Sequence, residues 1–184
     1  MAGDHPESTY AVLGLVDKLP GSSGYELTAV ADRSFAHFWP ISQTLLYREL
    51  GRLVDLGWVA GTRVDQVRSP SKWTYQTTPD GQQALIAWLG RPAPPKSTFR
   101  SGFLLRLFFA YRMPPAQVRS LLGDYRRTVQ SELDEFEAIT DKLAMIGTPE
   151  AGAGRLAALH GLRTAEARLA WIDEVEAMLE EDHP

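Results

Sequence analysis

Residues 42–48 concentrate hydrogen-bonding side chains at the expected beginning of a helix. Ser42, Gln43 and Thr44 stand together, and Arg48 lies one helical turn further along. The free N–H groups at a helix start bind phosphate well, and a guanidinium can pair with a phosphate or with the edge of a guanine. These residue types are therefore suited to binding a nucleic acid rather than to catalysing a covalent reaction.

The apolar residues of the same segment predict the helix that positions these side chains. Four of them recur with helical spacing and form one stripe: Leu46, Leu50, Leu53 and Val54. Thr44 and Arg48 then lie on the opposite face. Ser42 is the expected N-cap of this helix, and Gly57 is its expected end.

The surrounding residues predict the rest of a small domain. A helical pattern covers residues 8–19, and a second begins near Ser23, which has the spacing of a capping box with Glu26. Residues 58–64 and 72–78 are rich in β-branched and aromatic residues and predict a hairpin, which a fourth helix follows. Three helices and a hairpin are the order of a winged helix-turn-helix, in which the third helix enters the major groove of DNA.

Two further groups complete the expected DNA-contacting surface. Arg68 and Lys72 flank the tip of the hairpin, where they can bind phosphates, and Tyr47 adds a hydroxyl and a flat ring to the helix. Simpler interpretations remain open. Tyr47 could pack against the neighbouring leucines, and Arg48 could form a solvated face with Glu49.

The second half of the chain is predicted to be helical. Three prolines in residues 91–102 mark a connection between a domain of residues 1–92 and a domain of residues 97–184. Residues 101–111 predict a short apolar helix that is buried. Two long helices follow and meet at the stop signal of residues 147–149.

The two long helices carry apolar residues at heptad spacing, with one polar interruption at Glu132, and predict an antiparallel hairpin. At ~1.5 Å per residue, a helix of ~30 residues spans roughly 45 Å, which is too long for a small neighbouring domain to cover. Near the end of the last helix the apolar stripe widens with Trp171, Val175 and Met178. A single chain would leave this surface exposed to water, so we expect a homodimer with these three residues in its interface.

Aromatic residues indicate packing sites and one ligand site. Four tryptophans are expected to pack within the small domain, because aromatic side chains bury a large area. They are Trp39, Trp58, Trp73 and Trp88. Four phenylalanines near the proline-rich connection form the expected pocket for a small aromatic or hydrophobic effector. They are Phe99, Phe103, Phe108 and Phe109.

Composition excludes several other classes of protein. Cysteine is absent, which excludes disulfides and thiolate zinc sites, and the four histidines have no metal-binding spacing. No catalytic or nucleotide-binding motif is found, so we expect neither an enzyme nor a cofactor. Without a run of 18 apolar residues or a signal peptide, the chain is expected to be cytoplasmic and to make no membrane contact. Residues 1–90 hold 7 basic and 9 acidic side chains, so DNA affinity is expected to be modest and salt-sensitive.

Four blocks within residues 10–90 keep a distinctive order and spacing: AVLGLV, GYEL, FWPISQTLLYRELGRLVDLGWV and KWTYQTTPDGQQAL. With these blocks the chain resembles the PadR family of transcriptional regulators, in the branch with a long helical C-terminal region. The resemblance implies a winged domain that binds operator DNA, C-terminal helices that form a dimer, and repression that a small ligand relieves. Carried over by position, it places six residues toward DNA: Tyr10, Ser42, Thr44, Tyr47, Arg48 and Lys72. The wing departs from the family, because three neutral residues separate Arg68 from Lys72.

These features predict a mainly α (α+β) protein with an N-terminal winged helix-turn-helix domain and a C-terminal antiparallel long-helix hairpin for dimerisation. The leading hypothesis is a homodimeric, ligand-responsive repressor that binds a pseudo-palindromic, double-stranded DNA operator. Two alternatives stay open. One is a winged-helix module that binds protein, which the net charge of −4 favours slightly. The other is a small-molecule sensor that does not bind DNA.

Overall fold

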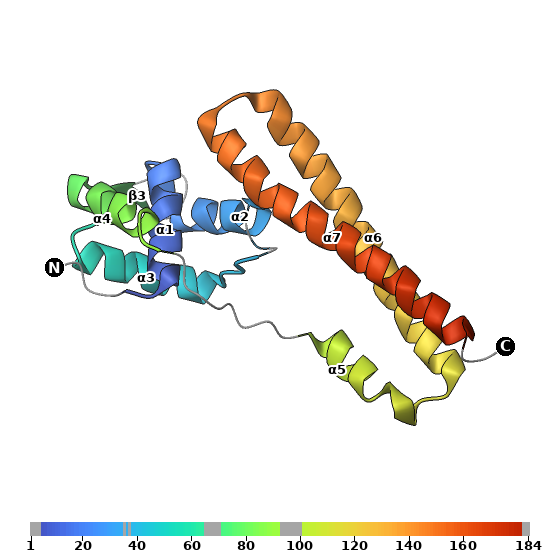
Figure 1. Cartoon of the computed structure of the whole chain (residues 1–184). Coiled ribbons are helices and arrows are strands. Elements are labelled where there is room, and N and C mark those ends of the chain that lie inside the picture. The colour runs from blue at the N-terminus through green and yellow to red at the C-terminus, as the bar shows by residue number, and fades with distance from the viewer. Residues whose placement is uncertain (1–4, 35, 37, 65–70, 93–100, 182–184) are drawn as a thin grey trace. The chain divides into compact units, whose positions relative to one another are not determined.

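The chain divides into two units, Met1–Pro95 and Lys96–Pro184 (Figure 1). The computed structural model describes residues 5–34, 36, 38–64, 71–92 and 101–181. Two of the predicted site residues, Arg68 and Phe99, lie outside these ranges.

The first unit has the order of elements of a winged helix-turn-helix. Its helices are α1 (Glu7–Lys18), α2 (Gly24–Ser34), α3 (Gln43–Asp55) and α4 (Pro79–Leu89). Its strands are β1 (Ser22–Ser23), β2 (Val59–Val64) and β3 (Lys72–Thr77), which form an antiparallel sheet in the order β1-β3-β2. The predicted fold class and hairpin are confirmed, whereas the sequence pattern does not predict the two-residue β1.

The core of the first unit lies against the inner face of α3. Leu46, Leu50 and Leu53 are buried there, in one cluster with apolar residues of α1, α2 and β2. Val54, the fourth residue of the predicted stripe, is instead 41% exposed, and Glu49 is fully buried. The prediction for Val54 is wrong, because the buried stripe continues through Glu49 at i+3 from Leu46 and ends at Leu53.

Local sequence signals determine the ends of α2 and α3. Ser23 and Glu26 form the predicted capping box: the Ser23 N–H donates to Glu26 Oε2 over 2.7 Å, and the Glu26 N–H donates to Ser23 Oγ over 3.4 Å. Ser42 Oγ caps α3 by accepting from the Leu45 N–H over 3.3 Å. Beyond α3, Gly57 has a φ of 70°, a left-handed conformation that glycine adopts without steric cost, and the chain turns there toward β2.

The second unit is an antiparallel hairpin of two long helices. α6 (Pro115–Ile146) and α7 (Pro149–Glu181) lie side by side, as predicted, and α5 (Gly102–Phe108) and the 3-10 turn η1 (Ala110–Arg112) precede them (Figure 1). Gly147, with a φ of 71°, ends α6. None of the described helices is long and apolar enough to cross a membrane.

Charged pairs close the narrow seam between α6 and α7. One cluster of buried apolar side chains in the seam consists of Val129, Ala165 and Ile172. Other buried apolar side chains lie along the two helices: Val118, Leu122, Ala151, Ala158 and Leu162. Arg126 donates to Asp173 over 2.5 Å and to Glu176 over 2.7 Å. Glu132, the polar interruption of the predicted heptad pattern, accepts a hydrogen bond from Arg168 of α7. These pairs fix the register of the hairpin, because each joins α6 to α7.

The prediction that α5 is buried is wrong for the single chain. Phe103 packs on the hairpin, with 3.7 Å between its ring centroid and that of Tyr125 in a stacked arrangement. Leu105 and Phe108 are instead 62% and 76% exposed. The apolar residues of α5 occupy most sides of this short helix, so burying them all requires neighbours on most sides. The hairpin contacts the helix on one side, and the apolar residues on the other sides stay exposed.

Candidate nucleic-acid interface

The outer face of α3 carries the polar side chains that the sequence predicts there. Ser42, Gln43 and Thr44 are exposed at its beginning, and the Arg48 side chain, one turn further, is 68% exposed. The buried leucines of the opposite face hold the helix against the core. The exposed face therefore offers hydroxyl, amide and guanidinium groups on a rigid support.

A buried carboxylate lies behind this face. Glu49 is fully buried, and its Oε2 accepts a hydrogen bond from Thr9 Oγ1 of α1 over 2.8 Å. Arg48 Nη2 lies 3.4 Å from Glu49 Oε1, and Arg52 Nη1 lies 3.5 Å from Glu49 Oε2. The interpretation in which Arg48 and Glu49 form a solvated face is wrong for Glu49, because this carboxylate joins α3 to α1 and orients two guanidinium groups.

Tyr47 connects α3 to the beginning of α2. A Cβ atom at Gly24 would stand 2.6 Å from Tyr47 Cε1, so a larger residue would have to move the ring. The Tyr47 side chain is nevertheless 43% exposed. The ring end therefore packs against the start of α2, and part of the side chain is accessible on the outer surface.

The wing adds two cations to this surface. In the register of β2 and β3, Arg63 pairs with Trp73, and Val64 pairs with Lys72. Arg63 Nε donates to Ser71 Oγ over 3.1 Å. Arg63 is absent from the predicted site, although its place on a β-hairpin arm next to the predicted tip is a signal that could have found it.

A groove of about 560 Å³ joins the wing to the start of α2 and to α3. It is lined by Ser23, Gly24, Tyr25, Glu26, Tyr47, Lys72, Trp73 and Tyr75. Tyr25 and Trp73 are 73% and 54% exposed. The prediction that Trp73 packs inside the domain is wrong, because this residue shares with Tyr75 the face of β3 that opens into the groove. The alternation of aromatic residues in β3 is the sequence signal for such a face.

Two titratable groups of the groove have shifted pKa values. The Ser23 hydroxyl and the Ser23 N–H donate to Glu26 and, with the nearby charge of Lys72, lower the pKa of Glu26 below its ordinary value of 4.5. Burial, with a smaller contribution from Tyr47, raises the pKa of Tyr75 above its ordinary value of 10.0. At neutral pH the groove therefore holds a carboxylate and a neutral phenol.

Tyr10 lies in the core of the first unit, so the prediction that it faces DNA is wrong. It is 1% exposed and stacks on Trp88 of α4 with 5.0 Å between the ring centroids. Its hydroxyl is buried without a hydrogen-bond partner among the described residues. On α1 it belongs to the same buried face as Leu13, and this packing leaves no surface for a DNA contact.

Three of the four phenylalanines predicted to bind an effector lie in the described part of the second unit, and these three do not form one enclosed surface there. Phe103 faces the hairpin, whereas Phe108 and Phe109 contact each other edge to face and are 76% and 50% exposed. A cavity of about 260 Å³ lies instead in the first unit, between α1 and α4, and its lining includes Tyr10 and Trp88.

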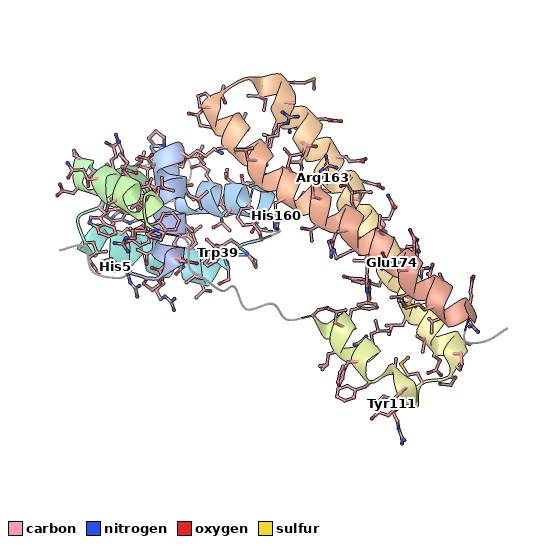
Figure 2. The ribbon with its side chains drawn as sticks, in the orientation of Figure 1. His5, Trp39, Tyr111, His160, Arg163 and Glu174 are labelled. Atoms are coloured by element: carbon pink, nitrogen blue, oxygen red, sulfur yellow. The ribbon has the colours of Figure 1, made fainter. Side chains whose placement is uncertain are left out.

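The three residues predicted for the dimer interface lie along the end of α7. Trp171 and Val175 are half-buried, and Trp171 lies edge-on to Phe103 of its own chain with 6.2 Å between the ring centroids. Met178 is 63% exposed. Figure 2 shows Tyr111 projecting from η1, where it is 79% exposed. The second unit therefore presents apolar side chains from both α5–η1 and α7.

Histidine and acidic side chains do not gather into a metal site anywhere in the described ranges. Figure 2 shows His5 in the first unit and His160 on α7. His5 packs edge-on against Trp58 with 5.0 Å between the ring centroids.

Comparison with known families assigns both parts of the chain. The family model of PadR-like transcriptional regulators matches residues 12–87. A model described as the C-terminal part of virulence activator alpha matches residues 99–180. Together these matches cover the winged unit and the helical hairpin.

Individual relatives match nearly the whole chain. The probable transcriptional regulator Rv1176c of Mycobacterium tuberculosis is 30% identical over 176 residues, which are 87% of this chain and 91% of that protein. The negative transcriptional regulator PadR of Bacillus subtilis is 26% identical over 178 residues, which are 94% of this chain and 97% of that protein.

Two crystal structures of the Bacillus subtilis PadR resemble the fold. The complex with operator DNA has a TM-score of 0.84 and 25% identity and covers 95% of this chain and 99% of that chain. The complex with p-coumaric acid has a TM-score of 0.77 and 25% identity, and the match covers 94% of this chain and 98% of that chain. Both relatives are transcriptional regulators, a class of protein without enzymatic activity, which agrees with the prediction that this chain is not an enzyme. From its two matched regions and its 30% identical relative, the chain belongs to the PadR-like family of transcriptional regulators.

Proposed function

We propose that the chain is a homodimeric repressor that binds a pseudo-palindromic DNA operator. In this proposal α3 enters the major groove with Gln43, Thr44 and Arg48 toward the bases, and Lys72 of the wing contacts the sugar-phosphate backbone. The observation that carries the proposal is the exposed polar face of α3, which the buried leucines and Glu49 hold in a fixed orientation. A rigid polar helix surface beside a cationic wing is suited to reading a duplex.

The comparisons support this assignment through two properties of the Bacillus subtilis relative. That protein is a negative transcriptional regulator, and it has been crystallised with operator DNA. Because the alignment covers 95% of this chain, the likeness includes both the winged unit and the hairpin. We expect the chain in the cytoplasm, where the DNA of its bacterial relatives lies.

The dimer follows from the exposed apolar surface of the second unit. Leu105, Phe108 and Tyr111 are 62%, 76% and 79% exposed, and Met178 of α7 adds to them. Soluble monomers rarely expose contiguous apolar patches of this kind, so we assign a second copy of the chain as the cover. Two winged units would then reach half-sites about one helical turn of DNA apart.

A small aromatic effector is proposed to regulate DNA binding. The relative's complex with p-coumaric acid supports an effector of this class. In the first unit, the cavity between α1 and α4 is lined by the rings of Tyr10 and Trp88 and by the polar residues Lys18 and Ser34, so it combines aromatic and polar groups. Binding there would quench or shift the tryptophan fluorescence, and unchanged fluorescence over a panel of phenolic acids would exclude this cavity.

The test of the proposal is a titration of labelled DNA from upstream of the gene for this protein. We expect Arg48→Ala to weaken binding by ~1–3 kcal/mol, because one guanidinium contact to a base or phosphate is lost. Arg127→Ala is the matched control, since the Arg127 side chain is 76% exposed on α6 and pairs with Asp124 of its own helix. Full affinity of Arg48→Ala would remove Arg48 from the interface.

A second candidate function is a winged-helix module that binds protein. The net charge of −4 is the observation that favours it, since DNA-binding domains usually carry a basic surface. Absence of binding to any duplex at low salt, with the dimer intact, would support this candidate and contradict the repressor.

A further inference from the structure

The groove between the wing and α2 contains an ion pair at the place where the proposed DNA strand would pass. Lys72 Nζ lies 3.5 Å from Glu26 Oε1, and the two side chains are 38% and 51% exposed. Both residues line the groove together with the exposed rings of Tyr25 and Trp73. Lys72, one of the cations that the wing offers to a phosphate, is therefore already paired with a carboxylate of the same chain.

The two members of this pair differ in mobility. Glu26 Oε2 accepts hydrogen bonds from the Ser23 N–H over 2.7 Å and from Ser23 Oγ over 2.6 Å, so the carboxylate is held at the start of α2. Lys72 stands on β3 with a long, flexible side chain, and Glu26 is its side-chain partner there. When a phosphate approaches, the ammonium can move while the carboxylate stays in place.

We propose that Glu26 competes with DNA for Lys72. The carboxylate holds the ammonium in the free protein and gives it up when a sugar-phosphate strand enters the groove, so Glu26 lowers the affinity of the chain for duplex DNA. This inference rests on the proposed function, because it requires the groove to face the duplex. It makes Glu26 an affinity-limiting residue within a groove whose other lining side chains are neutral or cationic.

Glu26→Gln separates the charge of Glu26 from its structural role. Glutamine is the other residue type that completes a capping box, so its amide oxygen can accept from the Ser23 N–H and preserve the start of α2. The substitution removes the negative charge from the groove and releases Lys72. Circular dichroism and the thermal midpoint check that the variant is folded.

The probe is a fluorescein-labelled duplex of mixed sequence, since a phosphate contact does not depend on base sequence. We expect Glu26→Gln to bind this duplex about 3- to 10-fold more tightly at low salt, a gain that fades as salt screens the charges. Asp32→Asn is the matched control, because Asp32 is an exposed acid at the other end of α2. A gain of the same size in Asp32→Asn would attribute the effect to net charge and overturn the inference.

A double-mutant cycle with Lys72→Gln isolates the competition. If Glu26 acts by holding Lys72, the gain from Glu26→Gln falls to less than about twofold when Lys72 is absent, since the two effects are coupled. If Glu26 acts only by repelling phosphate, the gain stays as large or grows in the Lys72→Gln background, and the competition is excluded.

The failures of the inference and of the proposed function are distinguishable. If the unmodified chain does not bind the duplex or the upstream DNA at low salt, the proposed function fails. If the unmodified chain binds and Glu26→Gln leaves the affinity unchanged, the proposed function stands and the competition is contradicted.

Discussion

The winged unit and the helical hairpin bury their apolar side chains in different ways. Among the described residues, the winged unit has one cluster of 12 buried side chains, which three helices, a strand and Ile41 of the α2–α3 connection contribute. The corresponding cluster of the hairpin contains three, Val129, Ala165 and Ile172, and charged pairs flank it. The other buried apolar side chains of the hairpin are spaced along its two helices outside this cluster. The first unit therefore has its own core, whereas the second has a seam and an exposed apolar surface.

This difference separates the tasks of the two units. A helix that reads DNA must hold its side chains in fixed positions, and a dense core with the Glu49 anchor provides such a support. A dimerisation unit can leave apolar side chains exposed in the single chain, because the partner covers them. Changes in the first unit should then act independently of protein concentration, and changes in the second should depend on it.

The largest expected effect is the loss of a core side chain of the winged unit. Leu50 is 1% exposed, and Leu50→Ala should lower the free energy of unfolding by ~3 kcal/mol, since a buried leucine leaves a cavity when it is truncated. Urea denaturation at two protein concentrations measures this loss. If the loss of unfolding free energy disappears at the higher protein concentration, the winged unit does not have a core that is independent of the dimer.

The next effect concerns the anchor between α1 and α3. Glu49→Gln should cost ~1–2 kcal/mol of stability, because a neutral amide keeps a hydrogen bond from Thr9 but loses the attraction of Arg48 and Arg52. Asp55→Asn, an exposed acid on the same helix, serves as the control and should change stability by less than about 0.5 kcal/mol. Equal effects of the two variants would show that Glu49 is not an anchor.

A third variant tests the exposed surface of the hairpin unit. Phe108→Asp should weaken the dimer at least about tenfold, or ~1.4 kcal/mol, because it places a charge in the proposed interface. Light scattering over a concentration series measures the dissociation. Met145→Asp changes a residue that is 83% exposed at the opposite end of the hairpin, and we expect this control to remain dimeric. Dissociation of the control alone would move the interface to that end.

The smallest effect is a pH dependence of stability that originates at Glu26. The pKa of Glu26 in the folded chain lies below 4.5, because the Ser23 hydroxyl, the Ser23 N–H and the Lys72 charge favour the carboxylate. Its contribution is thus fully present above the ordinary pKa and is lost as the pH falls through the folded value. Thermal unfolding from pH 7 to acid should show Glu26→Gln slightly less stable at pH 7 and the two proteins converging in acid. A constant difference across this range would contradict the assignment.

The features that the sequence predicts correctly depend on neighbouring residues. The Ser23–Glu26 capping box, the Ser42 cap of α3 and the turn at Gly57 follow from local hydrogen bonds and backbone sterics. The outer face of α3 follows from the helical period, which places Thr44 and Arg48 opposite the leucines. The order of three helices and a hairpin, and then the family resemblance, led to the prediction that this face contacts DNA, which stays a prediction for the individual residues.

The features that the sequence does not predict depend on contacts between distant segments. Glu49 is buried because Thr9, 40 residues earlier, donates to it. Tyr10 is a core residue because α4 brings Trp88 against it, and a match of position within a family does not show on which side of α1 a ring lies. Trp73 looks like a packing residue by type, yet its face of β3 is open. The hydrophobic pattern of one segment does not predict which distant segment packs against it, and therefore does not predict which of its side chains are buried.

The contact between Gly24 and Tyr47 has a consequence for how such a protein could change its target. A single methyl group at residue 24 would overlap the tyrosine ring, since its carbon would lie 2.6 Å from Cε1. A larger residue at position 24 would therefore displace the ring end of the Tyr47 side chain. Because Tyr47 is 43% exposed on α3, enlarging residue 24 would reposition one side chain of the proposed DNA-contacting surface without exchanging that side chain itself.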